Sequence, residues 1–501
     1  MQTRRFSARA LWGFAAWALP LAVVFVLTPT LLRLLGQDRF GVLMLVFVTP
    51  LIAAQLDLGI ASNGIRQLAA AMAIGNVDAG RTLVTFSLAL GLIGAALATA
   101  VWFGASAISS ALGFDTVLGA SSGSELVRAC AVWIAISMAT LLPGLVARAA
   151  QALVWITALQ TLAAVSLWLG ALLIVRSGQP LTDVVVLGIG LSLAVGVTMA
   201  FAMRQRIDWG GAPRFDYRLI TQDRRFSAGI FGSQVASMLV YQGDRILISA
   251  LGSPAIVGAY SLCANVANKT LAAVVALTSF VFPHAAALHS TDRVREIEEL
   301  SHALNRAVIV LVVPLLTPGW VLATPFLLLW LGEFSSAELI MAFRILWLAF
   351  AIPAFAVPIG NILISSGRAE LAARFSWLTA IVVLGSMLLL VPNYGLLGAT
   401  TAMLLGMSTS FLFRFAAQRA LGLHAASGFR RFWLGIGLGV VAQGAVLACI
   451  GGIASWPTLF AAAAGAWFIF YLVRVVLRML SPEEAQLLNR LIPAIRGARG
   501  K

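Results

Sequence analysis

The sequence has few charged residues and almost no cysteine. Only 11% of its 501 residues are charged, against about 25% in a typical soluble domain. A soluble fold is therefore excluded, because so few charges cannot cover the surface of a chain that is 60% hydrophobic. The only cysteines, Cys130, Cys263 and Cys449, lie singly in apolar runs. Their spacing excludes a disulfide framework, a thiolate zinc cluster and a CxxC redox site.

Catalytic motifs are also missing. No phosphate-binding loop of the GxxxxGK[ST] pattern is present, which argues against direct ATP hydrolysis. The four histidines show no metal-ligand spacing, so we expect neither a metal nor another cofactor. No segment on the predicted outer side is long enough to hold a folded catalytic domain. We therefore expect a protein that is not an enzyme.

Long hydrophobic runs make up most of the sequence. A helix needs about 20 mainly apolar residues to cross a bilayer, and fourteen runs approach or exceed that length. They occupy residues 11–33, 41–62, 82–107, 127–147, 153–175, 181–203, 227–250, 255–283, 306–331, 337–363, 374–392, 396–418, 432–453 and 457–477. The sequence therefore predicts an all-α polytopic membrane protein with fourteen transmembrane helices.

Arginine carries almost all of the positive charge, and its placement indicates the orientation of the chain. If the N-terminus is cytoplasmic, 27 of the 34 Lys and Arg residues fall on the cytoplasmic side, as the positive-inside rule requires. A miscounted helix would invert this pattern downstream. We therefore expect both termini in the cytoplasm, and the net charge of +15 needs no nucleic-acid partner.

Two short stretches of the sequence are similar to each other. Residues 35–41 (LGQDRFG) join the first two segments, and residues 251–258 (LGSPAIVG) join the seventh and eighth. Both connections run in the same direction, so they predict a parallel repeat of two six-helix lobes around a central cavity. The predicted domains are an N-terminal lobe (1–203), a cytoplasmic linker (204–226), a C-terminal lobe (227–420), and two further helices with a basic tail (421–501).

Lys269 lies near the middle of the predicted eighth helix, close to Asn265 and Asn268. An ammonium group facing lipid at this depth would cost from about 2.5 to more than 10 kcal/mol. We therefore expect Lys269 to face a polar, wet cavity that binds the substrate. The alternative is a structural ion pair with a neighbouring carboxylate.

Asp244 and Arg245 follow Tyr241 and Gln242 in the predicted seventh helix, and Tyr241, Gln242 and Arg245 are candidate substrate-binding residues. Adjacent residues of a helix point about 100° apart, so the two charged side chains cannot share a face. One is expected to face the cavity and the other a neighbouring helix or the headgroup layer. Asp244 is the natural partner of Lys269, because helices seven and eight form a hairpin. That pair is either a switch or a structural link.

Three further charged residues lie in or beside predicted helices. Asp57 either binds a coupling cation or pairs with Arg66, and Arg344 is either a cavity cation or an interfacial anchor. The predicted cavity then holds more positive than negative groups. Such a site suits an anionic cargo, such as a phosphate, a pyrophosphate or an acidic sugar.

The chain resembles the polysaccharide-flippase (Wzx-like) branch of the multidrug/oligosaccharidyl-lipid/polysaccharide exporter superfamily. The resemblance spans roughly residues 10–480, and the order and placement of its motifs are more specific than any one of them. These motifs are Leu56-Asp57-Leu58-Gly59-Ile60 with Arg66, Asp244-Arg245-Ile246-Leu247-Ile248 through Gly258-Ala259-Tyr260, Ser366-Gly367-Arg368, and Asn393-Tyr394-Gly395-Leu396-Leu397-Gly398-Ala399.

The resemblance implies translocation of an undecaprenyl-pyrophosphate-linked oligosaccharide repeat unit by alternating access. This transport would take place in the bacterial inner membrane, for exopolysaccharide, capsule or O-antigen synthesis. Membrane lipids, a polysaccharide polymerase and a chain-length regulator are the partners it implies. It also implies that the two extra helices form a groove for the lipid tail, as in related transporters. Coupling to a proton or sodium gradient is expected, with Asp57 and Asp244 as the candidate ion-coupling residues.

Other functions remain open on the same scaffold. A peptidoglycan-precursor flippase and a cation-coupled drug exporter are the first alternatives, although the excess of cavity cations disfavours the drug exporter. An integral polysaccharide polymerase or ligase is the alternative from a different class. The short outer loops disfavour it.

Overall fold

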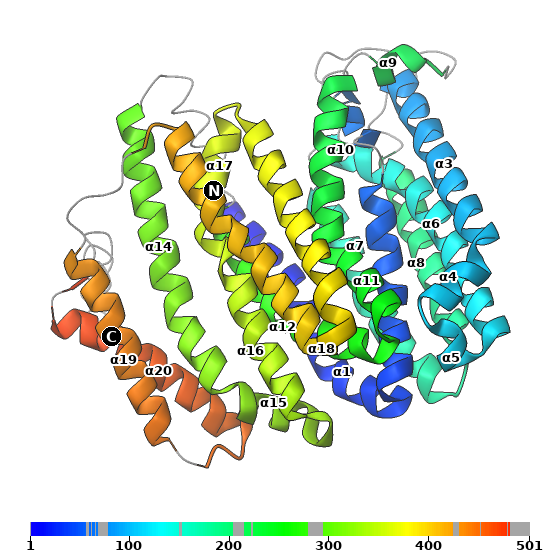
Figure 1. Ribbon diagram of the computed structural model, residues 1–501. Helices are drawn as coiled ribbons and strands as arrows, with labels where there is room; N and C mark the ends of the chain where they lie inside the picture. The colour runs from blue at the N-terminus through cyan, green and yellow to red at the C-terminus, as the bar shows by residue number, and fades with distance from the viewer. Residues whose placement is uncertain are drawn as a thin grey trace. The chain divides into compact units, whose positions relative to one another are not determined.

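The computed structural model describes most of the chain, and every regular element in the described part is a helix (Figure 1). The described residues group into two compact units, 1–261 and 262–501, which divide inside one helix. The domain boundaries predicted from the sequence, at 204–226 and 421, stay a prediction. The residues described are 2–56, 60–61, 63–65, 67–68, 79–149, 153–203, 215–221, 224–278, 294–423, 430–450, 452–477 and 479–480.

The first unit is a bundle of long apolar helices. α6 packs against both α3 and α8, and α1 packs along α7. Its elements are α1 (Gln2–Gln55), α3 (Ala79–Phe103), α4 (Ala105–Ala111), α5 (Phe114–Leu118), α6 (Ala120–Ala149), α7 (Leu153–Arg176), α8 (Leu181–Met203), α9 (Tyr217–Thr221), α10 (Arg224–Met238), η2 (Leu239–Gly243), α11 (Asp244–Leu251) and the start of α12 (Pro254–Thr278).

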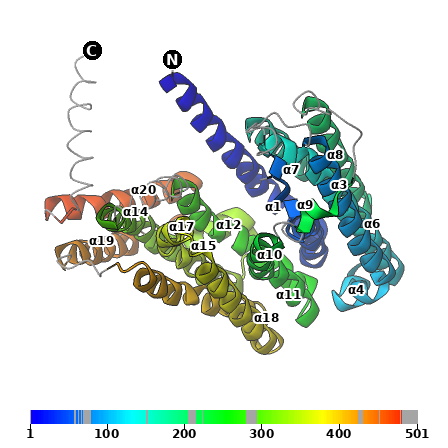
Figure 2. The same cartoon turned by 90° about the horizontal axis from the view of Figure 1, so that it is seen from above.

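The second unit is also helical. α14 packs against α16 and α19, and α20 lies along α19 (Figure 2). Beyond the remainder of α12, its elements are α14 (Val294–Val321), α15 (Ala323–Leu331), η3 (Gly332–Phe334), α16 (Ala337–Ala351), η4 (Pro353–Phe355), α17 (Val357–Ser365), α18 (Ala369–Ala420), α19 (Arg430–Cys449) and α20 (Trp456–Val476).

Ten helices in the described part of the chain are long and apolar enough to cross a membrane. The protein is therefore a multi-pass membrane protein, and the predicted count of fourteen is not confirmed by this number. α12 is not one of the ten; it carries Asn265, Asn268 and Lys269. The predicted seventh segment is shared among α10, η2 and α11.

Two glycines divide the longest helices. Gly36 in α1 has φ 71° and ψ 174°, and Gly395 in α18 has φ 51° and ψ −123°. Side chains are strained at these positive φ values, which glycine adopts readily. Each helix therefore consists of two arms joined at a glycine. Gly36 lies in the predicted connection at residues 35–41, and Gly395 lies between the predicted segments 374–392 and 396–418.

The two turns of similar sequence, at residues 35–41 and 251–258, contact each other through their backbones. A Cβ atom added to Gly41 would lie 1.7 Å from the carbonyl oxygen of Pro254, and one added to Gly258 would lie 3.1 Å from the carbonyl oxygen of Gln37. No side chain fits at Gly41 unless the backbone of Pro254 moves. This close approach seats the start of α12 against the turn of α1, within residues 1–261.

Two prolines in α14 determine how α19 and α20 bind to it. A proline lacks the N–H group that would bond the carbonyl four residues earlier, so Pro314 frees the carbonyl of Val310 and Pro318 frees that of Pro314. The Tyr471 hydroxyl of α20 donates to the Val310 oxygen at 2.9 Å, and the buried Gln443 amide of α19 donates to the Pro314 oxygen at 2.8 Å. Freed carbonyls in an apolar environment need such donors.

We expect Gly41→Ala to lower the free energy of unfolding by about 1–3 kcal/mol, the usual cost of overpacking a tight contact. The measurement is the thermal melting of the purified protein in detergent. Gly91→Ala in α3 is the matched control, because a Cβ atom there would meet nothing within 4 Å. Equal melting temperatures for the two variants would show that the contact between the turns is not tight.

Candidate functional site

A π-helical turn interrupts the predicted seventh helix. η2 (Leu239–Gly243) contains Tyr241 and Gln242 and lies between α10 and α11. Such turns insert an extra residue into the helical repeat and are frequent at functional sites. The sequence predicts one uninterrupted segment over residues 227–250, and the hydrophobic pattern contains no signal for the π turn. Two of the predicted binding residues therefore lie where the helix is irregular.

Asp244 begins α11 and is buried, with 3% of its surface exposed. Its carboxylate accepts a hydrogen bond from the Tyr260 hydroxyl at 2.8 Å and another from the backbone N–H of Arg245 at 2.8 Å. Tyr260 lies in the first turns of α12 and is fully buried. The two residues belong to the same motif of the family resemblance, which joins the helices on which they lie.

Two glutamines near this carboxylate in the sequence carry unsatisfied acceptors. The Oε1 atoms of Gln234 in α10 and Gln242 in η2 are buried without a hydrogen-bond partner in the described part of the chain. A buried amide oxygen costs free energy when it is left unpaired. The segment around the π turn is therefore suited to bind a polar group of another molecule.

The predicted residues of α12 lie on one face of that helix. Asn265 precedes Asn268 by three residues and Lys269 by four, so its side chain lies between theirs in a stripe about 100° wide, and all three residues are half-buried. They belong to the second unit, whereas Asp244 belongs to the first. The pairing of Lys269 with Asp244 therefore stays a prediction.

Arg344 in α16 is held by groups of its own unit. Its Nε donates to the carbonyl oxygen of Trp320 at 3.0 Å, and its Nη2 donates to the Thr324 hydroxyl at 3.2 Å. The guanidinium also lies over the Trp320 ring, 5.7 Å from the ring centroid. These contacts hold the guanidinium against α14 and the start of α15, and they do not decide between a cavity cation and an interfacial anchor. A cavity role for Arg344 stays a prediction. Asp57 and Arg66 lie outside the described residues.

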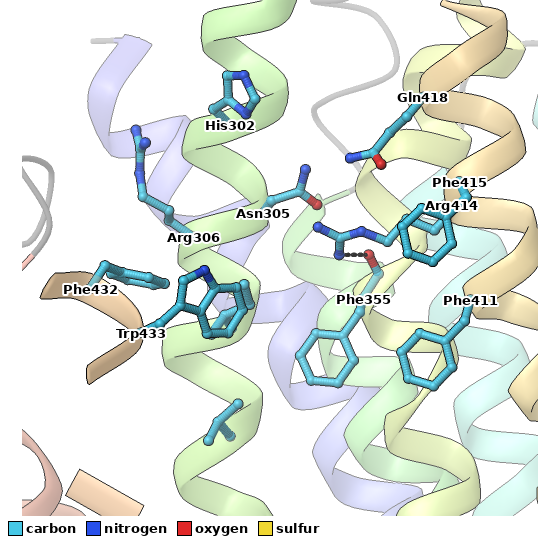
Figure 3. A pocket seen from close by; sticks show the side chains of 12 residues that line it. His302, Asn305, Arg306, Phe355, Phe411, Arg414, Phe415, Gln418, Phe432 and Trp433 are labelled. Carbon is cyan, nitrogen blue, oxygen red and sulfur yellow. Dashed lines mark hydrogen bonds between the residues drawn. The ribbon is translucent and has the colours of Figure 1, made fainter. Parts of the chain in front are cut away.

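A pocket of about 470 Å³ lies in the second unit, between α14, η4, α18 and the start of α19 (Figure 3). Its volume is in the range of small-molecule sites. Aromatic side chains form much of its wall, and the polar groups come from α14 and α18. The lining residues are His302, Asn305, Arg306, Ile309, Val313, Phe355, Phe411, Arg414, Phe415, Gln418, Phe432 and Trp433.

The sequence reasoning missed this pocket. Arg306, Arg414 and Arg474 are among the 27 basic residues that the sequence places on the cytoplasmic side, and the histidines show no ligand spacing that would mark His302. The structure places Arg414 in α18 and buries Arg474 completely between the rings of Phe432 and Phe470, 5.5 and 5.4 Å from their centroids. A signal was present, because Arg414 and Arg474 lie within the predicted segments 396–418 and 457–477.

Residues 30–335 match a family profile described as "Polysaccharide biosynthesis protein". A comparison with curated protein sequences finds no match.

Solved transporter structures share the fold at low sequence identity. A structure of the lipid II flippase MurJ in an inward closed conformation has a TM-score of 0.74 and 12% identity, covering 94% of this chain and 99% of its own. An inward-facing multidrug resistance transporter of the MATE family has a TM-score of 0.65 and 11% identity, covering 82% and 98%. A MOP superfamily transporter from Pyrococcus furiosus has a TM-score of 0.52 and 13% identity, covering 82% of this chain and 93% of its own.

Tyr260→Phe removes the hydroxyl that donates to the buried Asp244 carboxylate. Hydrogen bonds to charged groups contribute about 1.5–3 kcal/mol, so we expect a loss of stability of that order, read as a lower melting temperature in detergent. Tyr394→Phe is the matched control, since Tyr394 is 65% exposed. An unchanged melting temperature for Tyr260→Phe would show that Asp244 does not depend on this hydroxyl.

Proposed function

Because the chain belongs to the polysaccharide biosynthesis protein family, we propose that it is a flippase for a lipid-linked oligosaccharide. Its substrate would be an undecaprenyl-pyrophosphate-linked repeat unit, moved from the cytoplasmic to the periplasmic leaflet by alternating access. The family match over residues 30–335 is the observation that carries the proposal. The fold shared with a lipid II flippase supports it.

The physical problem of this transport fits the chemistry of the chain. A sugar headgroup cannot cross about 30 Å of hydrocarbon unaided, since each hydroxyl stripped of water costs several kcal/mol without a new partner. Polar groups along the path replace that water, while the polyprenyl chain remains in lipid. The half-buried Asn265, Asn268 and Lys269 on one face of α12 are suited to this role.

The proposed arrangement has fourteen crossings with both termini in the cytoplasm of a bacterial inner membrane. Two of the ten apolar helices, α1 and α18, are each divided by a glycine into two arms. The α10–η2–α11 segment and α12 supply the two remaining crossings. The distribution of arginine along the sequence supports the orientation.

The proposed substrate-binding residues come from three helical segments. They are Tyr241, Gln242, Arg245, Asn265, Asn268, Lys269 and Arg344. We assign ion coupling or gating to Asp57, Arg66 and Asp244. The burial of Asp244 and its hydrogen bond to Tyr260 support this assignment, because a carboxylate held between two helices can respond to protonation by releasing one of them.

A flippase for the peptidoglycan precursor is the second candidate. The TM-score of 0.74 to the lipid II flippase MurJ favours it. Reconstituted vesicles distinguish the two substrates. We expect energised vesicles to move an undecaprenyl-pyrophosphate oligosaccharide to the other leaflet and to leave lipid II in place. Movement of lipid II alone would overturn the polysaccharide assignment.

We expect Lys269→Ala to abolish translocation of the lipid-linked oligosaccharide in this vesicle assay, because the substitution removes the cation that faces the diphosphate. Lys269→Arg should retain part of the activity, since charge matters more than shape in a wide cavity. Lys501→Ala, at the only other lysine, is the matched control and should be as active as the unmodified protein.

The amount of protein that inserts into the membrane is measured for each variant. Normal transport by Lys269→Ala would remove Lys269 from the site. Equal loss of activity in Lys269→Ala and Lys269→Arg, with normal insertion, would indicate a tight structural ion pair in place of substrate binding.

A further inference from the structure

We propose that the pocket between α14, α18 and α19 binds the phosphate headgroup of a membrane lipid. It is built by residues of the second unit alone. The inference therefore does not depend on which substrate the protein transports. Four features carry it: the position of Arg414, an unpaired amide oxygen, the absence of acidic lining residues, and the exposed aromatic rim.

Arg414 supplies the positive charge of the pocket. It lies in the apolar helix α18 and extends toward α14, with its Nη1 donating to the Phe355 carbonyl oxygen at 2.9 Å (Figure 3). That bond uses one of the five N–H donors of the guanidinium. The planar fork of arginine matches the oxygens of a phosphate, so the remaining donors suit such a ligand.

The wall of the pocket carries no carboxylate among the described residues. Glu298 lies outside the wall, with its carboxylate 3.7 Å from Nε2 of the lining His302. No ion pair of Arg414 is present among the described residues. Arginine is costly at membrane depth unless it is paired or hydrated. A bound anion would offset this cost.

Asn305 adds a buried polar group from α14. Its side chain points toward Arg414 in Figure 3, and only 7% of the residue is exposed. Its Nδ2 lies 3.5 Å from the Ser301 hydroxyl, whereas its Oδ1 is buried without a hydrogen-bond partner in the described part of the chain. The free oxygen can accept from a headgroup hydroxyl while Arg414 binds the phosphate.

The rim of the pocket carries exposed aromatic side chains. Phe411 and Phe415 of α18 are 45% and 66% exposed, and Trp433 of α19 is 54% exposed. Phe355 and Phe432 continue the apolar wall inward. A ligand with acyl or prenyl chains matches this lining, whereas free inorganic phosphate matches only the polar end.

Native mass spectrometry of the intact protein in detergent tests the proposal. Phosphatidylglycerol, undecaprenyl phosphate and inorganic phosphate are titrated separately. We expect either or both lipids to bind and Arg414→Gln to weaken the binding about tenfold, the usual effect of one lost charge-assisted hydrogen bond. Arg419→Gln is the matched control, because Arg419 is exposed five residues later on the same helix; it should change the affinity less than twofold.

Two further variants keep the test decisive if Arg414→Gln does not fold. Arg414→Lys retains the charge and should bind the lipid more tightly than Arg414→Gln. If Arg414→Gln does not fold, the affinity of Arg414→Lys should lie within about tenfold of that of the unmodified protein. Asn305→Leu removes the free acceptor and should weaken phosphatidylglycerol more than undecaprenyl phosphate, which has no headgroup hydroxyl beyond its phosphate.

Three outcomes would overturn the proposal. One is equal lipid affinity in Arg414→Gln and Arg419→Gln. Another is an affinity for phosphatidylglycerol that Asn305→Leu leaves unchanged. The third is inorganic phosphate binding as tightly as the lipids, which would indicate a free-anion site.

Discussion

Every polar group in the apolar interior of this protein needs a partner, and the packing of the helices depends on that constraint. In lipid no water is available to bond a free carbonyl or guanidinium. The prolines of α14 show the consequence, because each frees a carbonyl that a side chain of another helix then bonds. The hydrogen bonds of Tyr471 and Gln443 thereby fix the positions of α20 and α19 along the axis of α14. Apolar contacts alone would fix these positions less well, since lipid tails are as apolar as the side chains.

Charged residues of the helices follow the same rule. Asp244 is paired with a tyrosine hydroxyl and a backbone N–H, and Arg344 with a carbonyl, a hydroxyl and an indole ring. The one hydrogen bond from Arg414 to the Phe355 carbonyl uses only part of its guanidinium. Its remaining donors are therefore suited to a ligand.

Membership of the polysaccharide biosynthesis family and the fold it shares with flippases are consistent with these local features. The π turn at Tyr241 and Gln242 and the polar residues of α12 lie outside the ten helices that are long and apolar enough to cross a membrane. Polar residues are costly in lipid, and these two segments carry most of the residues that we propose contact the oligosaccharide.

The sequence by itself determined the helical class, the position of most segments, the glycine turns at Gly36 and Gly395, and the family. These properties depend on hydrophobic length and on local backbone conformation, which neighbouring residues specify. Only the tertiary structure decided the partners: Tyr260 for Asp244, Trp320 and Thr324 for Arg344, and the pocket around Arg414 and Asn305. Each of these contacts joins residues of different helices. The hydrophobic pattern of one helix does not encode which face of another helix it contacts.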